Sequence, residues 1–309
     1  MMINAVTSRE YGMMFPCPPH IFNGVAFTEH NRHKCDDGDV RYLFAGDGKV
    51  RGGIILGRRD GMLHSPFSAP FGGLTVSRSR RFEAVDGMWR EIVEYCRAEG
   101  LGLRVTLPPE PYAPELTVKS VSALSRLGLT PTLDVSYNLD LGRGSFRDGI
   151  SRSCRKLLNQ ASGNGLSVAK VVPVPENILR VYNIIRTNHL SKGRPMWMEP
   201  DDVISTAMLV KADFFLLMYD GADIAGAMVY PAGEGIAQVV YWGDMPGYSE
   251  LRAMNLLAEY VYEYYRRAGM RLLDLGPATE TGVPNYGLCV FKESLGAEPT
   301  LKYTMMLQG

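Results

Sequence analysis

The stretch Leu127-Gly-Leu-Thr-Pro131-Thr-Leu-Asp-Val-Ser-Tyr-Asn-Leu-Asp-Leu141 returns later in the chain as Leu295-Gly-Ala-Glu-Pro299-Thr-Leu-Lys-Tyr-Thr-Met-Met-Leu-Gln-Gly309. The identical residues in the two stretches share one offset of 168 (295 − 127). A match at constant offset is the sequence signature of a repeated structural unit. The repeat therefore predicts two copies of one domain.

Two further pairs of segments extend the match upstream. Residues 95–108 align with 264–277 at an offset of 169 (264 − 95), and residues 42–53 align with 215–226 at an offset of 173 (215 − 42). The change of four residues indicates a length difference between the paired strands and the helix. At 309 residues, the chain is long enough for two domains that each bury a core.

The hydrophobic periodicity of each copy predicts the element order β-β-β-α-β-α-β. The first copy opens with a hairpin whose turn is Gly46-Asp47-Gly48, and its main helix spans 82–97. In the second copy, Ser249 is expected to cap a helix over 251–265. The predicted strands cover 40–44, 50–56, 62–66, 101–107 and 133–139, and then 214–218, 224–230, 236–242, 272–275 and 301–307.

This order predicts an α/β protein in which each domain is a mixed, mostly antiparallel sheet flanked by helices. We expect an N-terminal domain over 1–141 and a second core over 213–309. Residues 142–212 belong to neither repeat and are expected to complete the second domain. Their pattern predicts helices over 150–161, 176–190 and 201–211 and a strand over 166–172.

Composition excludes several classes of function. The 33 basic residues balance the 33 acidic ones, so no global field attracts a polyanion. DNA binding is therefore not expected, and the charge balance does not favour tRNA. The five cysteines and the histidines lack paired metal-ligand spacing, which argues against a metal site and favours a reducing compartment. With neither a signal-like segment nor an apolar membrane span, we expect a cytoplasmic protein.

Three segments of the second half carry a family resemblance. Tyr241-Trp-Gly-Asp244, Gly269-Met-Arg-Leu-Leu-Asp274-Leu-Gly276 and Gly287-Leu-Cys-Val-Phe291-Lys292-Glu-Ser-Leu-Gly296 resemble, in order and spacing, the C-terminal domain of the Fem family of aminoacyl and acyl transferases. The run Arg152-Ser-Cys-Arg155-Lys156 through Val168 is similar to the stretch by which that family enters its second domain. The resemblance implies two tandem GNAT-like acyltransferase domains.

The resemblance also implies an N-acyltransferase. Such an enzyme moves an acyl or aminoacyl group from acyl-CoA or aminoacyl-tRNA to an amine of a small molecule, such as a cell-envelope or polysaccharide precursor. In the family, the lysine of the Phe-Lys element lies at the active site, so this role falls to Lys292. A fixed cation stabilises the oxyanion of acyl transfer by about 3 kcal/mol. Tyr241 is the second catalytic candidate, to position substrate or pass a proton.

The other candidates are expected to bind substrate. They are Phe291, Trp242, Asp244, Asp274, Tyr286, Arg152 and Arg155. Arg152 and Arg155 are one turn apart and able to hold one phosphate, or else they form a solvated helix face. Asp274 is either a carboxylate facing the amine or a strand-end residue that bonds neighbouring backbone. Tyr241 is open to a similar structural interpretation, as a half-buried strand tyrosine.

Two sequence features bear on where the chemistry lies. At an offset of 168, the position of Lys292 is Leu124 in the first copy, so the second copy is the expected active one. The run Pro246-Gly-Tyr-Ser-Glu-Leu-Arg252-Ala lacks the spaced glycines of the usual coenzyme A pyrophosphate loop. A non-catalytic protein that uses the tandem fold to bind a ligand or partner is the alternative. His64, on a predicted strand, is a further candidate to line the cleft.

Overall fold

The computed structural model describes residues 2–46, 49–76 and 81–309. Residues 47 and 48, on which the predicted hairpin turn falls, lie outside the described residues. The chain divides into two compact units. Unit 1 comprises residues 1–136, 279–283 and 300–309, and unit 2 comprises residues 137–278 and 284–299.

Unit 1 contains both α-helices and strands, with short 3-10 turns between them. Its elements are β1 (Met2–Val6), α1 (Ser8–Met14), η1 (Ile21–Asn23), α2 (Val25–Asn31), η2 (Arg32–Lys34), η3 (Asp36–Gly38), β2 (Val40–Gly46), β3 (Val50–Arg59), β4 (Met62–Ser65), α3 (Phe82–Ala98), β5 (Gly102–Thr106), η4 (Glu110–Tyr112) and α4 (Pro114–Arg126). It also holds the first part of β6 (Thr130–Asp140) and most of β14 (Glu298–Leu307).

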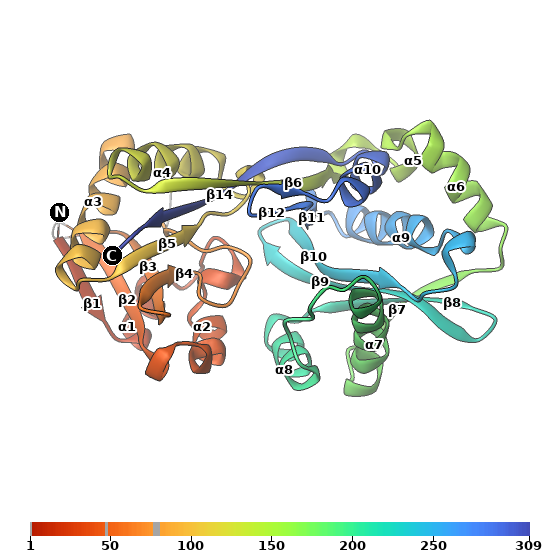
Figure 1. Cartoon of the computed structure of the whole chain (residues 1–309), viewed down its shortest axis with the longest axis horizontal. Coiled ribbons are helices and arrows are strands. Elements are labelled where there is room, and N and C mark those ends of the chain that lie inside the picture. Colours follow the sequence, from red (N-terminus) through yellow and green to blue (C-terminus); the bar gives the residue numbers. More distant parts are fainter. Residues whose placement is uncertain (1, 47–48, 77–80) are drawn as a thin grey trace. The chain divides into compact units, whose positions relative to one another are not determined.

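The sheet of unit 1 runs in the order β1-β2-β3-β4-β5-β14-β6. β4 and β5 are parallel, whereas β1 with β2, β2 with β3, β3 with β4 and β5 with β14 pair antiparallel. Successive side chains of each strand point to opposite faces of the sheet. Leu43 and Ile54 join the core under α3 and α4, whereas Tyr42 and Ile55 pack against Tyr11 of α1. Figure 1 shows α3 and α4 on one side of this sheet and α1 and α2 on the other.

Unit 2 repeats this arrangement. Its elements are the end of β6, η5 (Leu141–Arg143), α5 (Phe146–Gly149), α6 (Arg152–Ser162), β7 (Ser167–Val171), α7 (Pro175–Ser191), α8 (Pro200–Val210), β8 (Asp213–Tyr219), β9 (Ala222–Gly233), β10 (Ile236–Asp244), η6 (Ser249–Leu251), α9 (Ala253–Arg267), β11 (Leu272–Pro277) and α10 (Tyr286–Ser294). The short strands β12 (Thr279–Glu280) and β13 (Val283–Pro284) pair with each other between β11 and α10.

The strands of unit 2 run in the order β6-β11-β10-β9-β8-β7. β10 and β11 are parallel, whereas β9 with β10, β8 with β9 and β7 with β8 pair antiparallel. Gly226 and Gly243 face each other across β9 and β10. A Cβ atom on Gly243 would lie 2.9 Å from Asn188 of α7, and one on Gly226 would lie 3.1 Å from Val181. The two glycines therefore let α7 approach the sheet closely, on the face opposite α9 (Figure 1).

The repeat is longer than the sequence match indicates. In both units a first strand and two helices precede the hairpin: β1, α1 and α2 in unit 1, and β7, α7 and α8 in unit 2. The prediction that residues 142–212 lie outside the repeat is therefore wrong for residues 167–210. Surface helices keep their apolar spacing without keeping residue identities, so the alignment does not detect them.

The final strands are arranged differently from the predicted ranges. In unit 1 the neighbour of β5 is β14, and in unit 2 the neighbour of β11 is β6. Residues 137–141 therefore belong to unit 2, and residues 300–309 belong to unit 1, rather than dividing at 141 and 212. Both strands have the same alternating pattern, and that pattern does not specify which neighbour a strand takes.

The helix after β10 also begins later than expected. Ser249 lies in the 3-10 turn η6 instead of capping the helix. The N-cap of α9 is Arg252, a left-handed residue with φ of 57° that makes no side-chain capping bond. The predicted Ser249 cap is therefore wrong, because an extra turn of chain separates it from the helix.

Candidate functional site

The two parallel strands of unit 2 separate soon after they meet. β10 and β11 pair over Ile236–Gln238 and Leu272–Asp274. β10 then has an irregularity between Val239 and Tyr241 and continues to Asp244, whereas β11 ends at Pro277. We call the region bounded by residues 239–244 of β10 and 275–277 of β11 the β10–β11 fork. Backbone groups freed by such a separation are available to a ligand.

Asp274 lies at the base of the β10–β11 fork and is fully buried. Its Oδ2 accepts a hydrogen bond from Nε2 of Gln238 at 2.8 Å, and its Oδ1 accepts one from the backbone N–H of Gly276 at 2.7 Å. Oε1 of Gln238 is buried and has no partner in the part of the chain that the structure describes. These bonds are those of a strand-end residue that holds neighbouring backbone, which is one of the two interpretations of Asp274.

Lys292 projects from α10 toward the end of β11 and is only 2% exposed. Its Nζ donates to the carbonyl oxygens of Gly276 at 2.8 Å and Pro277 at 2.9 Å. Burial lowers the pKa of this ammonium to about 8, although the nearby Asp274 and Cys289 act in the opposite direction. An ammonium has three N–H donors, and these two bonds use two of them. The ring of Tyr137 lies 5.9 Å from Nζ.

Aromatic residues lie beside Lys292. The rings of Trp242 on β10 and Phe291 on α10 meet at a centroid distance of 5.7 Å. This contact places two predicted substrate-binding residues together on the α10 side of the β10–β11 fork. Tyr286, at the start of α10, has a side chain that is 77% exposed. The capping of α10 falls to the preceding Asn285, whose Oδ1 accepts from the N–H of Leu288.

Tyr241 lies on the opposite face of β10. Its ring contacts His189 of α7 at 5.5 Å, and burial raises the pKa of its hydroxyl. The backbone carbonyl and Oδ1 of Asp244 both accept from Nδ2 of Asn188, at 2.7 and 2.8 Å. Successive residues of a strand alternate between faces, so Tyr241 points toward α7 and Trp242 toward α10. The structure therefore does not place Tyr241 and Lys292 on one face.

The segment after α7 borders the same end of β10, and sequence reasoning gave it no role. Nδ1 of His189 lies 3.1 Å from the carbonyl oxygen of Pro195, and the hydroxyl of Tyr182 donates to that of Met198 at 3.0 Å. Nζ of Lys192 donates to Oδ1 of Asn188. Between these attachments, the side chain of Trp197 is 76% exposed. The signal available in the sequence was a tryptophan that follows Lys192 and Arg194 in a segment with Gly193 and Pro195.

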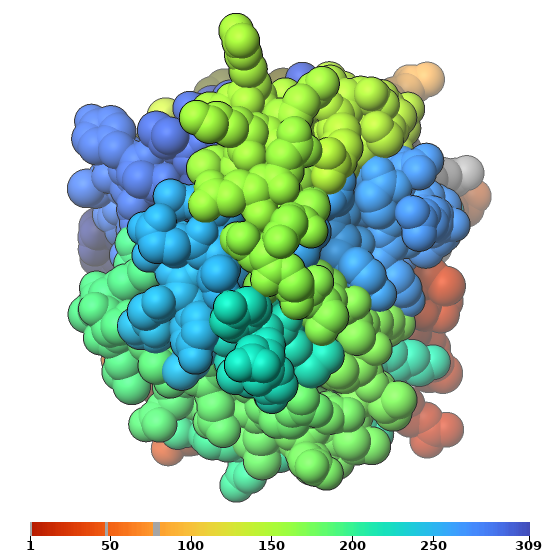
Figure 2. Space-filling view, turned by 90° about the vertical axis from the view of Figure 1, so that its right-hand side faces the viewer, coloured from red at the N-terminus to blue at the C-terminus, as the bar shows by residue number. Residues whose placement is uncertain are grey.

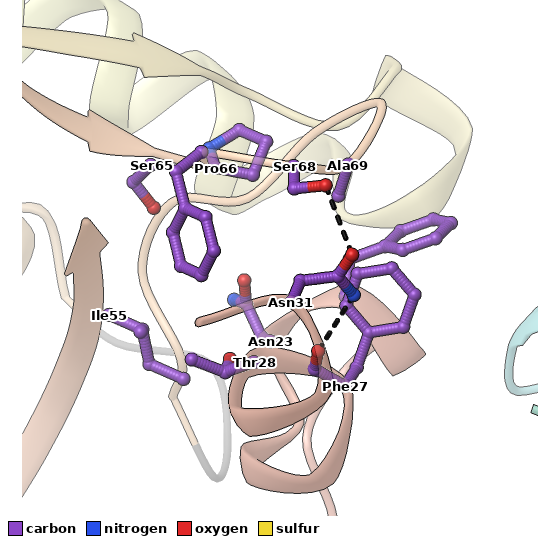
Figure 3. Close-up of a pocket in the computed structure, with 11 residues that line it drawn as sticks. Asn23, Phe27, Thr28, Asn31, Ile55, Ser65, Pro66, Ser68 and Ala69 are labelled. Atoms are coloured by element: carbon purple, nitrogen blue, oxygen red, sulfur yellow. Dashed lines mark hydrogen bonds between the residues drawn. The ribbon is translucent and has the colours of Figure 1, made fainter. Parts of the chain in front are cut away.

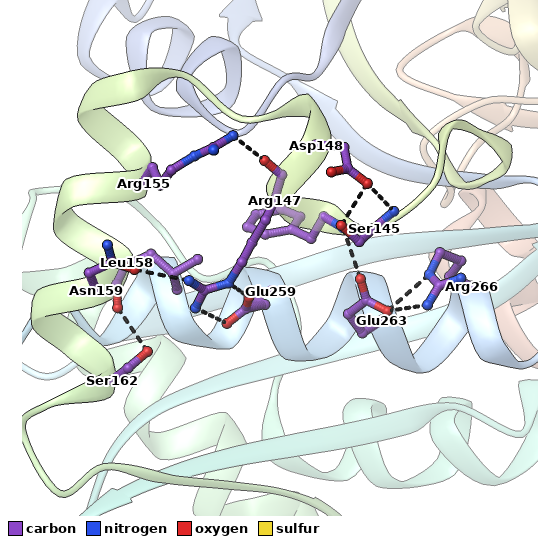
Figure 4. A network of polar contacts seen from close by, with 11 residues as sticks. Ser145, Arg147, Asp148, Arg155, Leu158, Asn159, Ser162, Glu259, Glu263 and Arg266 are labelled. Carbon is purple, nitrogen blue, oxygen red and sulfur yellow. Dashed lines mark hydrogen bonds and ion pairs between the residues drawn. The ribbon is translucent and has the colours of Figure 1, made fainter.

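The predicted phosphate-binding arginines are on α6. Arg155 donates to the backbone carbonyl of Arg147, and Arg147 itself pairs with Glu259 of α9 at 2.6 Å (Figure 4). Arg152 is exposed, and no ion pair involves it within the described ranges. In Figure 2 the yellow-green segment that contains α6 crosses over the blue segment that contains α9. The known contacts of Arg155 are thus with α5, and none links it to the β10–β11 fork.

A groove of about 740 Å³ follows the outer side of α9. Tyr260 and Tyr264 line it, and Arg147, Glu259 and Glu263 contribute charges. Glu263 accepts from the N–H of Phe146 and from Arg266, so most of these charges are already paired (Figure 4). The groove belongs to the α9 surface and none of the predicted site residues lines it.

The corresponding region of unit 1 is filled by protein. β4 and β5 are parallel, as β10 and β11 are. The loop after β4 returns across these two strands. The N–H of Gly72 donates to the carbonyl oxygen of Thr106 at 2.8 Å, and the backbones of Thr75 and Gly53 each donate an N–H to the carbonyl of the other. The ring of Phe71 is fully buried, 4.9 Å from that of His20.

The cavities left beside this loop are small. One, of about 10 Å³, is lined by residues that include Asn23, Asn31 and Ser68 (Figure 3). Another, of about 20 Å³, is lined by His20, Thr117 and other residues of the loop and α4. A water molecule needs about 10–15 Å³ measured in this way. These cavities therefore have room for water but not for an acyl chain.

Leu124 of α4 occupies the place of Lys292. The N–H of Leu127 donates to the carbonyls of Ala123 and Leu124, as the N–H of Leu295 donates to those of Phe291 and Lys292. Leu124 is fully buried in the core of unit 1. The two helices thus end alike and bury either a leucine or a lysine at the same position.

Comparison with solved structures supports the predicted fold. No family model matches the sequence, and no curated protein matches it. The chain is similar to the crystal structure of FemX, with a TM-score of 0.69, 12% identity and coverage of 98% of this chain and 97% of that one. It is also similar to the C-terminal domain of a putative lysylphosphatidylglycerol synthetase from Agrobacterium fabrum, with a TM-score of 0.62, 14% identity and coverage of 98% and 93%.

A third similar structure is a tandem GNAT protein from the clavulanic acid biosynthesis pathway, with a TM-score of 0.53 and 15% identity over 98% of this chain and 97% of that one. The predicted Fem-like fold of two tandem GNAT-like domains is therefore confirmed. In the part of the chain that the structure describes, no helix is both long and apolar enough to span a bilayer.

Proposed function

We propose that this protein is an N-acyltransferase whose reaction takes place at the β10–β11 fork of unit 2. An amine attacks the carbonyl carbon of an activated acyl group, a C–N bond forms, and the C–S or C–O bond to the carrier breaks. The amine proton leaves with the carrier or passes to a base. Negative charge develops on the carbonyl oxygen during the attack, so a nearby cation or N–H donor speeds the reaction.

The observation that carries this proposal is the burial of Lys292 where unit 1 has Leu124. A buried ammonium is costly, and the same helix end folds with leucine in unit 1. A group retained at such cost is a candidate for function. Its pKa of about 8 leaves Lys292 mostly protonated at neutral pH, as oxyanion stabilisation requires.

The donor in this proposal is a carrier-linked acyl or aminoacyl group, either acyl-CoA or aminoacyl-tRNA. The acceptor is an amine of a small molecule, such as a cell-envelope or polysaccharide precursor. Similar structures include FemX and a domain of a putative lysylphosphatidylglycerol synthetase, and lysylphosphatidylglycerol is a phospholipid that bears a lysyl group. In this proposal Trp242 and Phe291 bind the acyl group, Tyr286 and Asp244 border the substrates, and Tyr241 orients the amine from the α7 side. Arg152 and Arg155 hold a donor phosphate.

One observation favours a second candidate, a non-catalytic protein that binds a ligand or partner. Both hydrogen bonds of Lys292 go to the backbone carbonyls of Gly276 and Pro277. These bonds hold α10 against the end of β11, which stabilises the fold whether or not Lys292 takes part in a reaction. A lysine with this role alone would matter for stability and not for turnover.

An acyl-transfer screen distinguishes the two candidates. Radiolabelled acetyl-CoA, longer acyl-CoA thioesters and aminoacyl-tRNA are supplied as donors with a panel of amine acceptors, and product is measured for the wild type and for Lys292→Leu. We expect transfer by the wild type and a decrease of roughly a hundredfold in kcat/KM for the variant, because one oxyanion donor contributes about 3 kcal/mol.

Lys292→Arg and Leu124→Met serve as controls. The first keeps the charge and should retain part of the activity, and the second changes the equivalent position of unit 1 and should leave turnover unchanged. Thermal melting checks that each variant is folded. Equal turnover by the wild type and a folded Lys292→Leu would remove the catalytic role, and the absence of transfer with every donor would favour the binding protein.

A further inference from the structure

One face of the unit 1 sheet is only partly covered by helices. Leu63, Leu103 and Val105 point into the core beneath α3 and α4. On the opposite face, α1 packs over β2 and β3, where Tyr42 and Ile55 meet Tyr11. The residues of β4 and β5 that share this second face are Met62, His64, Arg104 and Thr106, and only Met62 among them is apolar. Arg104 is exposed.

Three nitrogen-bearing side chains adjoin on this second face. His64 of β4 is directly opposite Arg104 of β5 in the parallel register. Arg59 of β3 pairs with Met62, two residues before His64 on the same face. Nη1 of Arg59 donates to the carbonyl of Phe67, so its side chain reaches the loop after β4. Adjacent strands thus bring two guanidinium groups and one imidazole together.

These cations lack carboxylate partners. Neither Arg59 nor Arg104 forms an ion pair with any residue in the described ranges, unlike Arg58, which pairs with Asp37 and Asp39. Nε2 of His64 is shielded from solvent and has no hydrogen-bond partner among the described residues. An unpaired cation pair beside an unsatisfied imidazole nitrogen has the composition of an anion site.

We propose that Arg59 and Arg104, on the strands either side of His64, bind the phosphate of a ligand on this second face of unit 1. The planar guanidinium of Arg104 suits bidentate contact with phosphate oxygens, and the nearby Thr106 hydroxyl, 3.0 Å from that of Thr304, offers a further donor. The site belongs to unit 1, so phosphate binding there can be tested separately from acyl transfer at the β10–β11 fork of unit 2.

Acidity should strengthen this binding. Burial and the charges of Arg104 and Arg59 lower the pKa of His64, whereas the backbone of Arg59 and the charge of Asp60 oppose that shift. His64 is therefore neutral at pH 7 without ligand. A bound phosphate favours the protonated imidazole, so each phosphate binds together with a proton, and affinity rises as the pH falls.

Isothermal titration of the full chain with inorganic pyrophosphate tests the site. We expect saturable binding that Arg104→Gln weakens by about tenfold or more, since hydrogen bonds to charged groups are strong. Arg104→Lys should retain part of the affinity. Arg267→Gln, which removes an exposed cation of unit 2, should change affinity less than twofold. Binding by the wild type should strengthen from pH 8 to pH 6, and His64→Gln should remove that dependence.

Two further titrations identify the source of the phosphate. ADP represents soluble nucleotides, and vesicles of phosphatidylglycerol in phosphatidylcholine represent lipid headgroups, with the wild type and Arg104→Gln compared on each. Weakening of either by Arg104→Gln supports the site and names its ligand class. Absence of saturable pyrophosphate binding, equal affinity for the wild type and Arg104→Gln, or equal weakening by Arg267→Gln would overturn it.

Discussion

The two units differ most where their parallel strands separate. In unit 1 the loop after β4 fills the region with Phe71, and α4 buries Leu124. In unit 2 no such loop follows β10, which continues to Asp244, and α10 buries Lys292 against two carbonyls. A leucine stabilises a core by its burial, whereas a buried ammonium costs several kcal/mol. At equivalent positions, the same fold therefore buries a stabilising leucine in one unit and a costly ammonium in the other.

The comparison is tested most severely by exchanging the two residues. Leu124→Lys places an ammonium in a core of leucine and valine without the carbonyls that receive Lys292. We expect the free energy of unfolding to fall by about 5 kcal/mol, the upper range for an uncompensated buried charge. Urea denaturation followed by circular dichroism measures it.

Ser125→Lys, on the exposed side of the same helix, is the control and should change stability by less than about 0.5 kcal/mol. If Leu124→Lys is as mild as this control, unit 1 has a lysine-accepting site too, and the contrast between the units is lost.

Acid should destabilise the protein through unit 1. Burial lowers the pKa of His20 to about 3, against about 6.5 in an unfolded chain. Below pH 6.5 the unfolded chain binds a proton that the folded chain excludes, so stability falls as the pH decreases. From pH 7 to pH 4 the loss is about 3 kcal/mol. Urea denaturation at each pH measures it, and His20→Leu should show a flatter profile by this amount. Parallel profiles would contradict the assignment.

Alkali should act in the opposite sense through unit 2. The pKa of Lys292 is about 8 when folded, against about 10.4 when unfolded. Between these values the unfolded chain holds more protons, so this group raises stability as the pH increases. Relative to Lys292→Leu, the wild type should gain about 2.5 kcal/mol from pH 7 to pH 10. The difference between the two denaturation profiles isolates this contribution, and a difference that stays constant with pH would show an unperturbed lysine.

The smallest effect is expected at α6. Arg152 is exposed, so Arg152→Gln should raise KM for a phosphate-bearing donor only a few fold, equivalent to less than about 1 kcal/mol. The effect should shrink further at high salt because exposed charges are screened. Steady-state kinetics at two ionic strengths measure it. Lys156→Gln is the neighbouring control, and an equal increase in KM would indicate a diffuse basic surface.

Local patterns predicted much of this molecule because they depend on neighbouring residues. Alternation and helical spacing located the strands of both hairpins and the helices α3 and α9. The repeat offset paired Lys292 with Leu124, and the equal endings of α4 and α10 agree with that pairing. Trp242 and Phe291 were expected in one site, and their rings are in contact.

Other parts of the candidate site depend on contacts between distant residues. The opposite orientations of Tyr241 and Trp242 follow from the register of β10 with β9. The position of Trp197 depends on how α7 packs against Gly226 and Gly243. His64 and Arg104 are forty residues apart in the sequence, and only the parallel pairing of β4 with β5 brings them together.

Three features could be predicted from the sequence: the duplication, the order of elements and one lysine without a counterpart in the other copy. Each of these features follows from hydrophobic periodicity or from residues that are identical in the two copies. Three others required the folded structure: the pairing of β14 with β5 and of β6 with β11, the loop that returns across β4 and β5, and the burial of Lys292. These features depend on which apolar surfaces are buried against each other. That burial involves segments that are distant in the sequence, so local patterns do not predict it.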